Sequence, residues 1–327
     1  MDTVGKMSRT VAGMGYALIG GTLSFAGGVV LQHILIRVQR RLRMTQVQKS
    51  YGIGIDSHIK SSTPTMGGIA FVVTALIALG AQFDAEAFLF WGLPIACAVV
   101  GFTDDWLKSS TRSSEGLTSL RKLTAQTLVA FFWVTWASLQ KGLVLWPGLE
   151  CAFGLTFPVT LLAAVGTMNA VNVTDGLDGL AGGAFMISLS VLGYLLRGTD
   201  FLSAAFAVLV GAAASFLLYN VRPARIFMGD TGSHFLGGAL VALCVHGGAV
   251  GALIPAGFLF GIELFSSAIQ IIAIRKFNRK IFKFAPLHHH FQRLGWDETT
   301  VTSRFLIIHA TGAAFLAALG VQILGLR

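Results

Sequence analysis

Two adjacent acidic residues mark the first stretch whose residue types could do chemistry. Residues 101–106 read GFTDDW and contain Asp104 and Asp105. Carboxylates side by side repel each other, and either a divalent metal ion or Lys108, one helical turn later, would relieve that repulsion. The stretch therefore predicts a cation site, with a solvated helix end as the alternative.

A second stretch, residues 169–179, combines amides, carboxylates and glycines. Asp175 and Asp178 are three residues apart and would share a face if the stretch were helical. Asn172 adds a side chain that both donates and accepts hydrogen bonds, and the glycines allow a ligand to approach the backbone. The spacing of a calcium-binding EF-hand loop is absent, so the pattern favours either a ligand-binding turn or a helix cap.

A third acidic position lies between glycines. Asp230 follows Gly229 and precedes Gly232, so a metal ion could reach its carboxylate without steric hindrance. Phe227, close to a basic pair, could stack on a planar base. An aromatic residue at a membrane surface is also typical of an interface anchor, so both interpretations of Phe227 stay open.

Cationic residues accompany these acids in two further segments. Three consecutive histidines occupy residues 288–290, close to three lysines. Three neighbours on a helix cannot face one point, which disfavours a tris-histidine zinc site, and hydrogen bonding to phosphate is more natural. Lys60 precedes the TPTMGG segment at residues 63–68, which indicates a cation beside a glycine-lined helix entry or a simple membrane anchor.

Together these residue types predict a magnesium-dependent reaction between a soluble anionic donor and a lipid phosphate. Mg²⁺ prefers oxygen ligands, usually one or two carboxylates plus substrate phosphates. The surplus of cationic side chains favours a phosphate over the neutral sugar bond that a glycosidase cleaves.

Membrane-spanning helices must position these residues. The chain of 327 residues is 54% hydrophobic and 12% charged, against about 25% charged residues in average soluble proteins. Since a spanning helix needs roughly 20 mostly apolar residues, the uncharged runs predict an all-α polytopic membrane protein, a single domain over residues 1–327, with about ten transmembrane helices. The predicted spans are residues 11–36, 66–82, 87–103, 122–140, 151–171, 180–196, 201–219, 232–248, 252–274 and 304–326.

The basic residues predict the orientation of these spans. Of the 24 lysines and arginines, 19 fall in the loops after the odd-numbered spans. Basic loops are retained in the cytoplasm, so these loops are predicted to be cytoplasmic and both termini extracytoplasmic. Nine of the 15 acids lie on the same side, which places the chemistry there. The net charge of +9 then reflects the orientation of the chain in the membrane and attraction to anionic lipid or phosphate. A nucleic-acid partner is disfavoured, because the sequence has no basic stripe with interleaved aromatic residues.

Other features of the chain have simpler interpretations. Cys97, Cys151 and Cys244 lie in apolar stretches without metal-ligand spacing and are predicted to be small packed side chains. The uncharged run at residues 10–36 is too long for the apolar region of a signal peptide, so it predicts a retained span.

Five segments together resemble one known family. They read TPTMGG, GFTDDWLK, NAVNVTDGLDGLAGG, RIFMGDTGS and APLHHHFQRLGW, and they follow the order found in phospho-N-acetylmuramoyl-pentapeptide transferases, within the superfamily of polyprenyl-phosphate N-acetylhexosamine 1-phosphate transferases. The PLHHHF run favours the muramoyl-pentapeptide branch. The resemblance implies a homodimer of ten-helix chains in the bacterial plasma membrane, with Mg²⁺ as cofactor and the active site on the cytoplasmic face.

The resemblance also implies a reaction. The family transfers phospho-N-acetylmuramoyl-pentapeptide from UDP-N-acetylmuramoyl-pentapeptide to undecaprenyl phosphate, a membrane lipid, and so forms lipid I and UMP in the first membrane step of peptidoglycan synthesis. Matching positions assign catalytic roles to Asp104, Asp105, Asp230 and His289, with Asp230 as the magnesium ligand. The positions matched to substrate binding, with Phe227 stacking on uracil, are Lys60, Thr65, Lys108, Lys122, Asn169, Asn172, Asp175, Asp178, Asn220, Phe227, Gly229, His288 and His290.

Three alternatives remain open at this point. A sister enzyme that uses UDP-N-acetylglucosamine would share the acidic motifs. A secondary transporter of an anionic solute would also have many spans, but transporters place ionisable groups near the bilayer midplane, and Glu263 is the one acid within a predicted span. A non-catalytic scaffold would tolerate Asp230→Asn.

Overall fold

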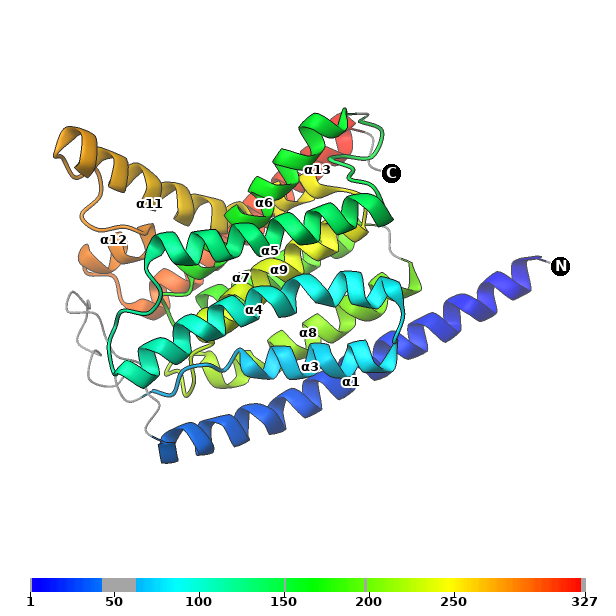
Figure 1. Cartoon of the computed structure of the whole chain (residues 1–327), viewed down its shortest axis with the longest axis horizontal. Coiled ribbons are helices and arrows are strands. Elements are labelled where there is room, and N and C mark those ends of the chain that lie inside the picture. Colours follow the sequence, from blue (N-terminus) through cyan, green and yellow to red (C-terminus); the bar gives the residue numbers. More distant parts are fainter. Residues whose placement is uncertain (1, 43–62, 150, 197–198, 325–327) are drawn as a thin grey trace.

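The described part of the chain is a bundle of helices that run roughly along one axis (Figure 1). The computed structural model describes residues 2–42, 63–149, 151–196 and 199–324, and within these ranges it has no extended β-strand and an isolated bridge between Trp146 and Leu149. The helices are α1 (Asp2–Leu42), α3 (Ile69–Ala81), α4 (Ala85–Thr111), α5 (Ser119–Gln140), α6 (Phe153–Thr174), α7 (Leu180–Leu195), α8 (Asp200–Asn220), α9 (Gly229–His246), η1 (Val250–Ala252), α10 (Leu253–Ala256), α11 (Phe258–Phe277), α12 (Leu287–Arg293) and α13 (Glu298–Leu324).

Each predicted span except residues 252–274 overlaps one helix in the described ranges. Six helices are long and apolar enough to cross a membrane, and α3 and α7 are shorter apolar helices. These findings confirm an all-α polytopic membrane protein. The count of ten crossings stays a prediction, because α5 and α9 are not among the helices that meet the length and hydropathy requirements.

The predicted ninth span, residues 252–274, is wrong in one respect, because it is broken near its start. Helix α10 ends at Ala256 and α11 begins at Phe258, with Gly257 between them. Neighbouring helices bind the backbone groups around the break: the Ser188 hydroxyl donates to the Ala256 carbonyl at 2.5 Å. Polar side chains thus supply partners for backbone groups that a continuous helix would satisfy by itself.

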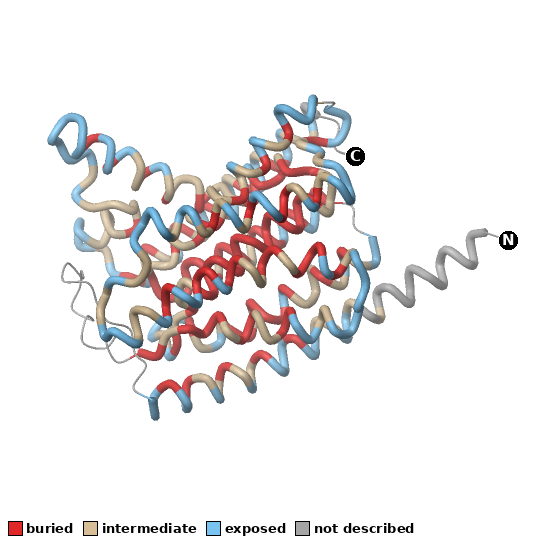
Figure 2. Tube along the Cα trace, in the orientation of Figure 1, coloured by how far each residue is buried: buried red, intermediate tan, exposed pale blue. Residues whose placement is uncertain are grey.

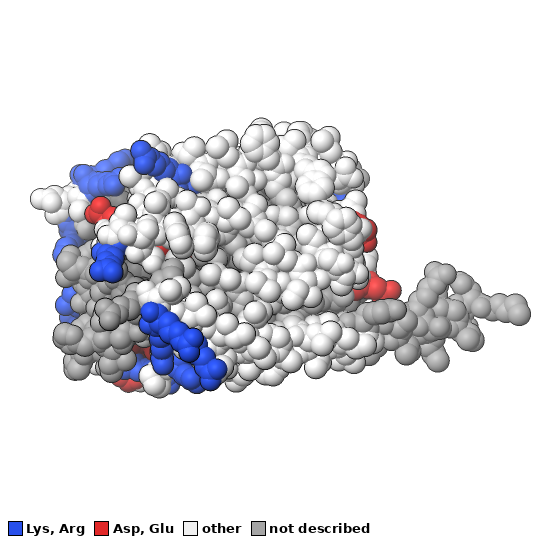
Figure 3. Space-filling view, turned by 60° about the horizontal axis from the view of Figure 1, so that its bottom comes forward, with Lys and Arg blue, Asp and Glu red and all other residues white. Residues whose placement is uncertain are grey.

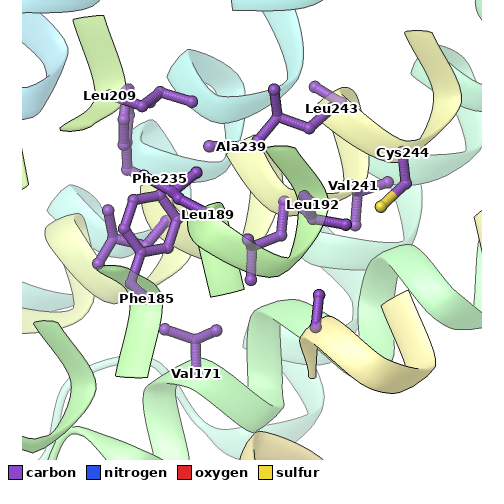
Figure 4. Close-up of a cluster of buried hydrophobic side chains, with 14 of the residues drawn as sticks. Val171, Phe185, Leu189, Leu192, Leu209, Phe235, Ala239, Val241, Leu243 and Cys244 are labelled. Atoms are coloured by element: carbon purple, nitrogen blue, oxygen red, sulfur yellow. The ribbon is translucent and has the colours of Figure 1, made fainter. Parts of the chain in front are cut away.

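Helix α9 forms the centre of the bundle (Figure 2). Every residue from Thr231 to Val245 is buried, and the helix packs mainly against α4 and α6. Phe235, Ala239 and Leu243 of α9 lie among apolar side chains of neighbouring helices (Figure 4). Since protein rather than lipid surrounds α9, its sequence can include small and polar residues that a lipid-facing helix would not favour.

The outer helices expose apolar side chains. Leu18 of α1, Phe265 of α11 and Phe315 of α13 are each exposed, as expected where hydrocarbon rather than water surrounds a helix. A broad band of the surface carries almost no charge, whereas lysines and arginines gather at one end (Figure 3). The last turns of α1, α4 and α11 carry basic residues and lie at that end, which we call the basic end.

Candidate active site

Four helices meet at the basic end and bring the predicted acids together. The three acids have ligand atoms within 4.8 Å of one another. The residues involved lie near the end of α4 (Asp104, Asp105), the start of α9 (Asp230), the start of α5 (Lys122) and the end of α6 (Asn172). Helix ends at a membrane surface can hold charged groups that the apolar interior would exclude.

Two lysines join Asp104 to Asp230. Lys108 Nζ lies 2.5 Å from Asp104 Oδ2 and 3.0 Å from Asp230 Oδ2. Lys122 Nζ lies 2.5 Å from Asp230 Oδ2 and 3.8 Å from Asp104 Oδ2. The expected contact of Lys108 with the acid one turn before it is therefore present, and Lys122 adds a second positive charge. We call Asp104, Lys108, Lys122 and Asp230 the lysine–acid cluster.

Asn172 completes the surroundings of Asp230. Its amide nitrogen donates to Asp230 Oδ1 at 2.7 Å and to Ser233 Oγ at 2.9 Å. Both carboxylate oxygens of Asp230 therefore have partners, one the amide and the other the two lysines. This arrangement fixes the orientation of the carboxylate before any ligand binds.

Asp105 has a different environment from Asp104. Its Oδ1 accepts the backbone N–H of Asp230 at 3.0 Å, and its Oδ2 accepts the backbone N–H and the hydroxyl of Thr231 at 2.8 and 2.7 Å. The first N–H groups of a helix have no partner within that helix. Asp105 thus caps α9 from the neighbouring α4 and fixes the backbone that carries Asp230.

Two glycines allow α4 and α9 to approach each other at this point. Gly229 has a φ of +71°, and a Cβ there would lie 2.5 Å from Asp105 Oδ2. A Cβ on Gly101 would lie 2.1 Å from the backbone oxygen of Asp230. Residue 229, a predicted site residue, therefore has to be glycine, because of its backbone conformation and the close approach of Asp105.

The TPTMGG segment pairs with the residues that precede Asp230. The Phe227 N–H donates to the Pro64 carbonyl at 2.9 Å, and the Gly67 N–H donates to the Phe227 carbonyl at 2.8 Å. These bonds fix the backbone of Phe227, whose side chain is half-buried. Thr65 lies between Pro64 and Gly67, in the segment that pairs with Phe227. The predicted substrate residue Lys60 lies outside the described residues.

Asp178 and Asn220 join the loop after α6 to the loop before α9. Asp178 Oδ2 accepts the Ala224 N–H at 3.0 Å. Asn220 Oδ1 accepts the Gly179 N–H at 3.0 Å, and its amide nitrogen donates to the Ile226 carbonyl at 2.9 Å. Both predicted substrate residues thus have backbone partners that hold two loops in place.

The conditional expectation that Asp175 and Asp178 share a helical face is wrong. Helix α6 ends at Thr174, Asp175 caps it, and turns follow until Gly179. Gly179, with a φ of +76°, is the N-cap residue of the next helix, α7. Asp175 is half-buried whereas Asp178 is buried, so the two acids have different surroundings.

His288 is buried against an acid from α11. Glu263 Oε1 accepts the backbone N–H of His288 at 3.2 Å, and Glu263 Oε2 lies 3.2 Å from His288 Nδ1. Both residues are fully buried. The other ring nitrogen faces Gly176, where an added Cβ would lie 2.3 Å from His288 Nε2. The pair therefore connects α11 and α12 to the loop that carries Asp175 and Asp178.

The other two histidines point to different partners. His289 Nδ1 lies 2.8 Å from Gln292 Oε1, and His290 Nδ1 accepts the Lys283 N–H at 3.1 Å. The rings of residues 288–290 therefore do not converge on one point, as the sequence predicts.

The lysine–acid cluster has the oxygen donors that Mg²⁺ prefers. Asp104 Oδ2 and Asp230 Oδ2 converge on Lys108 Nζ, so one cation already bridges them, and a hard divalent ion needs only one or two such carboxylates together with substrate phosphates. Asp105 fits less well, because backbone N–H groups and the Thr231 hydroxyl at the start of α9 occupy both of its oxygens. The partners of Asp104 Oδ2 and Asp230 Oδ2 are instead lysine side chains, which a metal ion could displace. The fit is thus to Asp104 and Asp230.

Four polar residues of the described helices were not predicted as site residues. Gln126 and His234 lie one turn beyond Lys122 and Asp230. Glu263 contacts His288, and Glu298 accepts from Asp178 N–H at 2.8 Å and pairs with Arg222 at 2.9 Å. The sequence feature that could have identified these four residues is a polar side chain within, or at the end of, an apolar run.

Comparison with known proteins places these residues in a family context. The model for glycosyl transferase family 4 matches residues 87–248. Curated relatives called phospho-N-acetylmuramoyl-pentapeptide-transferase include one from Bacillus pumilus, 35% identical over 92% of this chain and 95% of the relative. Another from Rubrobacter xylanophilus is 38% identical over 91% of this chain and 94% of the relative. One from Symbiobacterium thermophilum is 37% identical over 87% of this chain and 90% of the relative. The similarity therefore extends over nearly the whole length of each protein.

Proposed function

Because the chain belongs to the phospho-N-acetylmuramoyl-pentapeptide-transferase family, we propose that it transfers phospho-N-acetylmuramoyl-pentapeptide from UDP-N-acetylmuramoyl-pentapeptide to undecaprenyl phosphate. The products are lipid I and UMP. The enzyme acts as a single-domain homodimer in a bacterial plasma membrane, with the basic end on the cytoplasmic side.

One observation carries this proposal: two lysines and two carboxylates from α4, α5 and α9 converge at the basic end of the bundle. Both substrates are phosphate esters, one soluble and one held in the membrane. A site that combines ammonium groups with oxygen donors for a cation suits the transfer of a phosphoryl group between them. Its place at helix ends, rather than midway along the bundle, disfavours the transporter alternative.

The residues of the cluster have separate tasks in the reaction. Lys108 and Lys122, 31% and 17% exposed, attract the pyrophosphate of the donor and stabilise charge that develops as UMP departs. A terminal oxygen of the lipid phosphate attacks the β-phosphorus, the atom that carries the sugar, and the bond from this phosphorus to the UMP oxygen breaks. Phe227 stacks on the uracil ring, and Asn172 keeps the Asp230 carboxylate oriented.

Asp104 is not needed as a strong base in this scheme. A phosphate monoester has a second pKa of about 6, so the lipid phosphate is already mostly ionised at neutral pH. Asp104 instead holds Lys108 at 2.5 Å and supplies one of the oxygens for a cation. An aspartyl-phosphate intermediate on Asp104 is the alternative role.

Mg²⁺ would be held by Asp230 and Asp104, and when bound it would neutralise charge on the pyrophosphate. Chelation should then abolish turnover, and readdition of Mg²⁺ should restore it.

The purified protein in detergent, supplied with undecaprenyl phosphate, Mg²⁺ and one UDP-sugar at a time, tests the proposal through UMP release. We expect UMP from UDP-N-acetylmuramoyl-pentapeptide and its loss in Asp230→Asn. Release from UDP-N-acetylglucosamine alone would instead assign the chain to the sister activity. Turnover that persists with every divalent ion chelated would contradict the proposed cofactor.

A further inference from the structure

A second layer of polar side chains lies directly beneath the lysine–acid cluster. Gln126, Asn169 and His234 form it; Gln126 and His234 are buried in the bundle, and Asn169 is partly buried. Gln126 Nε2 lies 2.7 Å from His234 Nε2, and Asn169 Nδ2 donates to Gln126 Oε1 at 2.8 Å. We call these three residues the lower layer.

Each member of the lower layer is one turn away from a residue that contacts Asp230 or from Asp230 itself. Gln126 follows Lys122 on α5, and His234 follows Asp230 on α9, each by four residues. Helix α6 ends at the basic end whereas α5 and α9 begin there, so Asn169, three residues before Asn172, lies at the same depth. A helix rises about 1.5 Å per residue, and the two layers are thus roughly 4.5–6 Å apart.

The hydrogen bonds of the lower layer have a fixed direction. The Val165 carbonyl can only accept, and Asn169 Nδ2 donates to it at 2.8 Å. The Asn169 amide nitrogen therefore also faces Gln126 Oε1, and the nitrogen of Gln126 must face His234. His234 Nε2 then accepts this bond, which requires a neutral ring with its proton on Nδ1.

From this geometry we infer that the lower layer is a positioning device for the transferase reaction, an inference that rests on the proposed function. It holds α5, α6 and α9 in register, so that Lys122 and Asn172 meet Asp230 at 2.5 and 2.7 Å. His234 is the key residue of the lower layer. Asn169 of α6 donates to Gln126 of α5, and Gln126 donates to His234 Nε2 of α9, so His234 is the last acceptor in this series of bonds. Gln126, Asn169 and His234 act on the reaction through Lys122, Asn172 and Asp230.

Substitution of His234 tests the inference, with His309 as the matched control. Both histidines are fully buried, and both rings have hydrogen-bond partners. Those of His309 are Ser188, Ala184 and Leu259 in α7 and α11, away from the lysine–acid cluster. His234→Leu and His309→Leu should lower thermal stability similarly, whereas only His234→Leu should lower kcat, by about 10-fold or more, with KM for the UDP-sugar changed by less than about 3-fold.

Rescue distinguishes positioning from simple packing. His234→Gln retains an oxygen that can accept from Gln126, so it should recover kcat to within about 3-fold of the unsubstituted enzyme. Equal losses of kcat in His234→Leu and His309→Leu, or in His234→Leu and His234→Gln, would overturn the inference.

A measurement without turnover separates this inference from the proposed function. Histidine-selective ¹⁵N labelling of the full chain in nanodiscs, with His234→Leu to assign the signal, should show a neutral His234 protonated at Nδ1. A proton on Nε2 would overturn the fixed direction of the bonds. Failure of the unsubstituted enzyme to release UMP from any UDP-sugar would count against the proposed function and leave this spectroscopic result to decide the arrangement of the lower layer.

Discussion

Asp104 and Asp105 are neighbours in the chain, but their hydrogen-bond partners differ. Asp104 pairs with lysines that are 31% and 17% exposed and accepts the Leu117 N–H at 2.8 Å. Asp105 accepts three hydrogen bonds from Asp230 and Thr231. At the scale of the residue, the first acid belongs to the lysine–acid cluster, whereas the second caps the helix that carries Asp230.

Asp105→Asn should therefore destabilise the protein more than Asp104→Asn. Asparagine has one acceptor oxygen in place of two, which leaves at least one buried donor at the start of α9 unpaired and costs about 1–3 kcal/mol. Thermal unfolding of both variants in the same detergent measures the difference. An equal or larger loss of stability in Asp104→Asn would show that the capping of α9 is not the main role of Asp105.

The Glu263–His288 pair gives a second prediction. Glu263→Leu removes the acceptor of the buried His288 N–H, so it should cost about 1–3 kcal/mol. Because the two side chains contact each other, the variant that combines Glu263→Leu with His288→Leu should be more stable than the sum of the single effects predicts, by about 1–3 kcal/mol. A double-mutant cycle from unfolding midpoints measures this coupling, and strict additivity would contradict it.

At the scale of the element, the packing of α4 on α9 determines where Asp230 lies. Gly101→Ala should force the two helices apart, because the new Cβ would lie 2.1 Å from the Asp230 carbonyl oxygen. Gly92→Ala is the matched control on the same helix, since its Cβ would meet only Trp136, at 3.8 Å. Alanine is favoured over glycine in a helix by about 1 kcal/mol.

We therefore expect Gly101→Ala to lower both stability and transferase activity, the latter by about 10-fold or more, and Gly92→Ala to leave activity unchanged. Unfolding midpoints and UMP release on the two proteins check this. Full activity in Gly101→Ala would mean that the start of α9 tolerates displacement.

The helices and three members of the lysine–acid cluster could be predicted from the sequence for a physical reason, whereas Lys122 is assigned only through the family resemblance. Charged residues are costly in an apolar chain, so Asp104, Lys108 and Asp230 stand out. The role of Asp105 could not be predicted, because its partner Thr231 is 126 residues away in the chain and hydrogen-bond partners at that distance leave no local pattern. For the same reason, Gln126 and His234 look like isolated polar residues until the helices are packed together.

The break between α10 and α11 shows a similar limit. The composition of residues 252–274 is that of one uninterrupted span, with Pro255 and Gly257 near its start. Whether such residues bend or break a helix depends on neighbours that satisfy the freed backbone groups. Here Ser188 and His309 contact the backbone of Ala256 and Leu259, and both lie far from the break in sequence.

At the scale of the whole molecule, the two ends of the bundle carry different charged groups. The lysine–acid cluster lies where α4 ends and α9 begins. At the opposite end, where α4 begins and α5 finishes, Lys141 pairs with Glu86. Cys151 precedes α6 at this second end and is half-buried, whereas Cys97 and Cys244 are fully buried. The native cysteines thus provide one partly exposed thiol, at the end opposite the basic end.

This arrangement allows a direct test of orientation, with a second thiol introduced at the basic end by Lys280→Cys in a Cys151→Ser background. Lys280 is exposed and follows α11 at that end. If the basic end is cytoplasmic, a membrane-impermeant maleimide added to intact spheroplasts should label Cys151 of the unsubstituted protein and leave the Lys280→Cys protein unlabelled. Permeabilisation should then label the Lys280→Cys protein as well. Labelling of that protein in sealed spheroplasts would place the lysine–acid cluster outside the cell, where a cytosolic UDP-sugar could not reach it, and the proposed reaction would lose its donor.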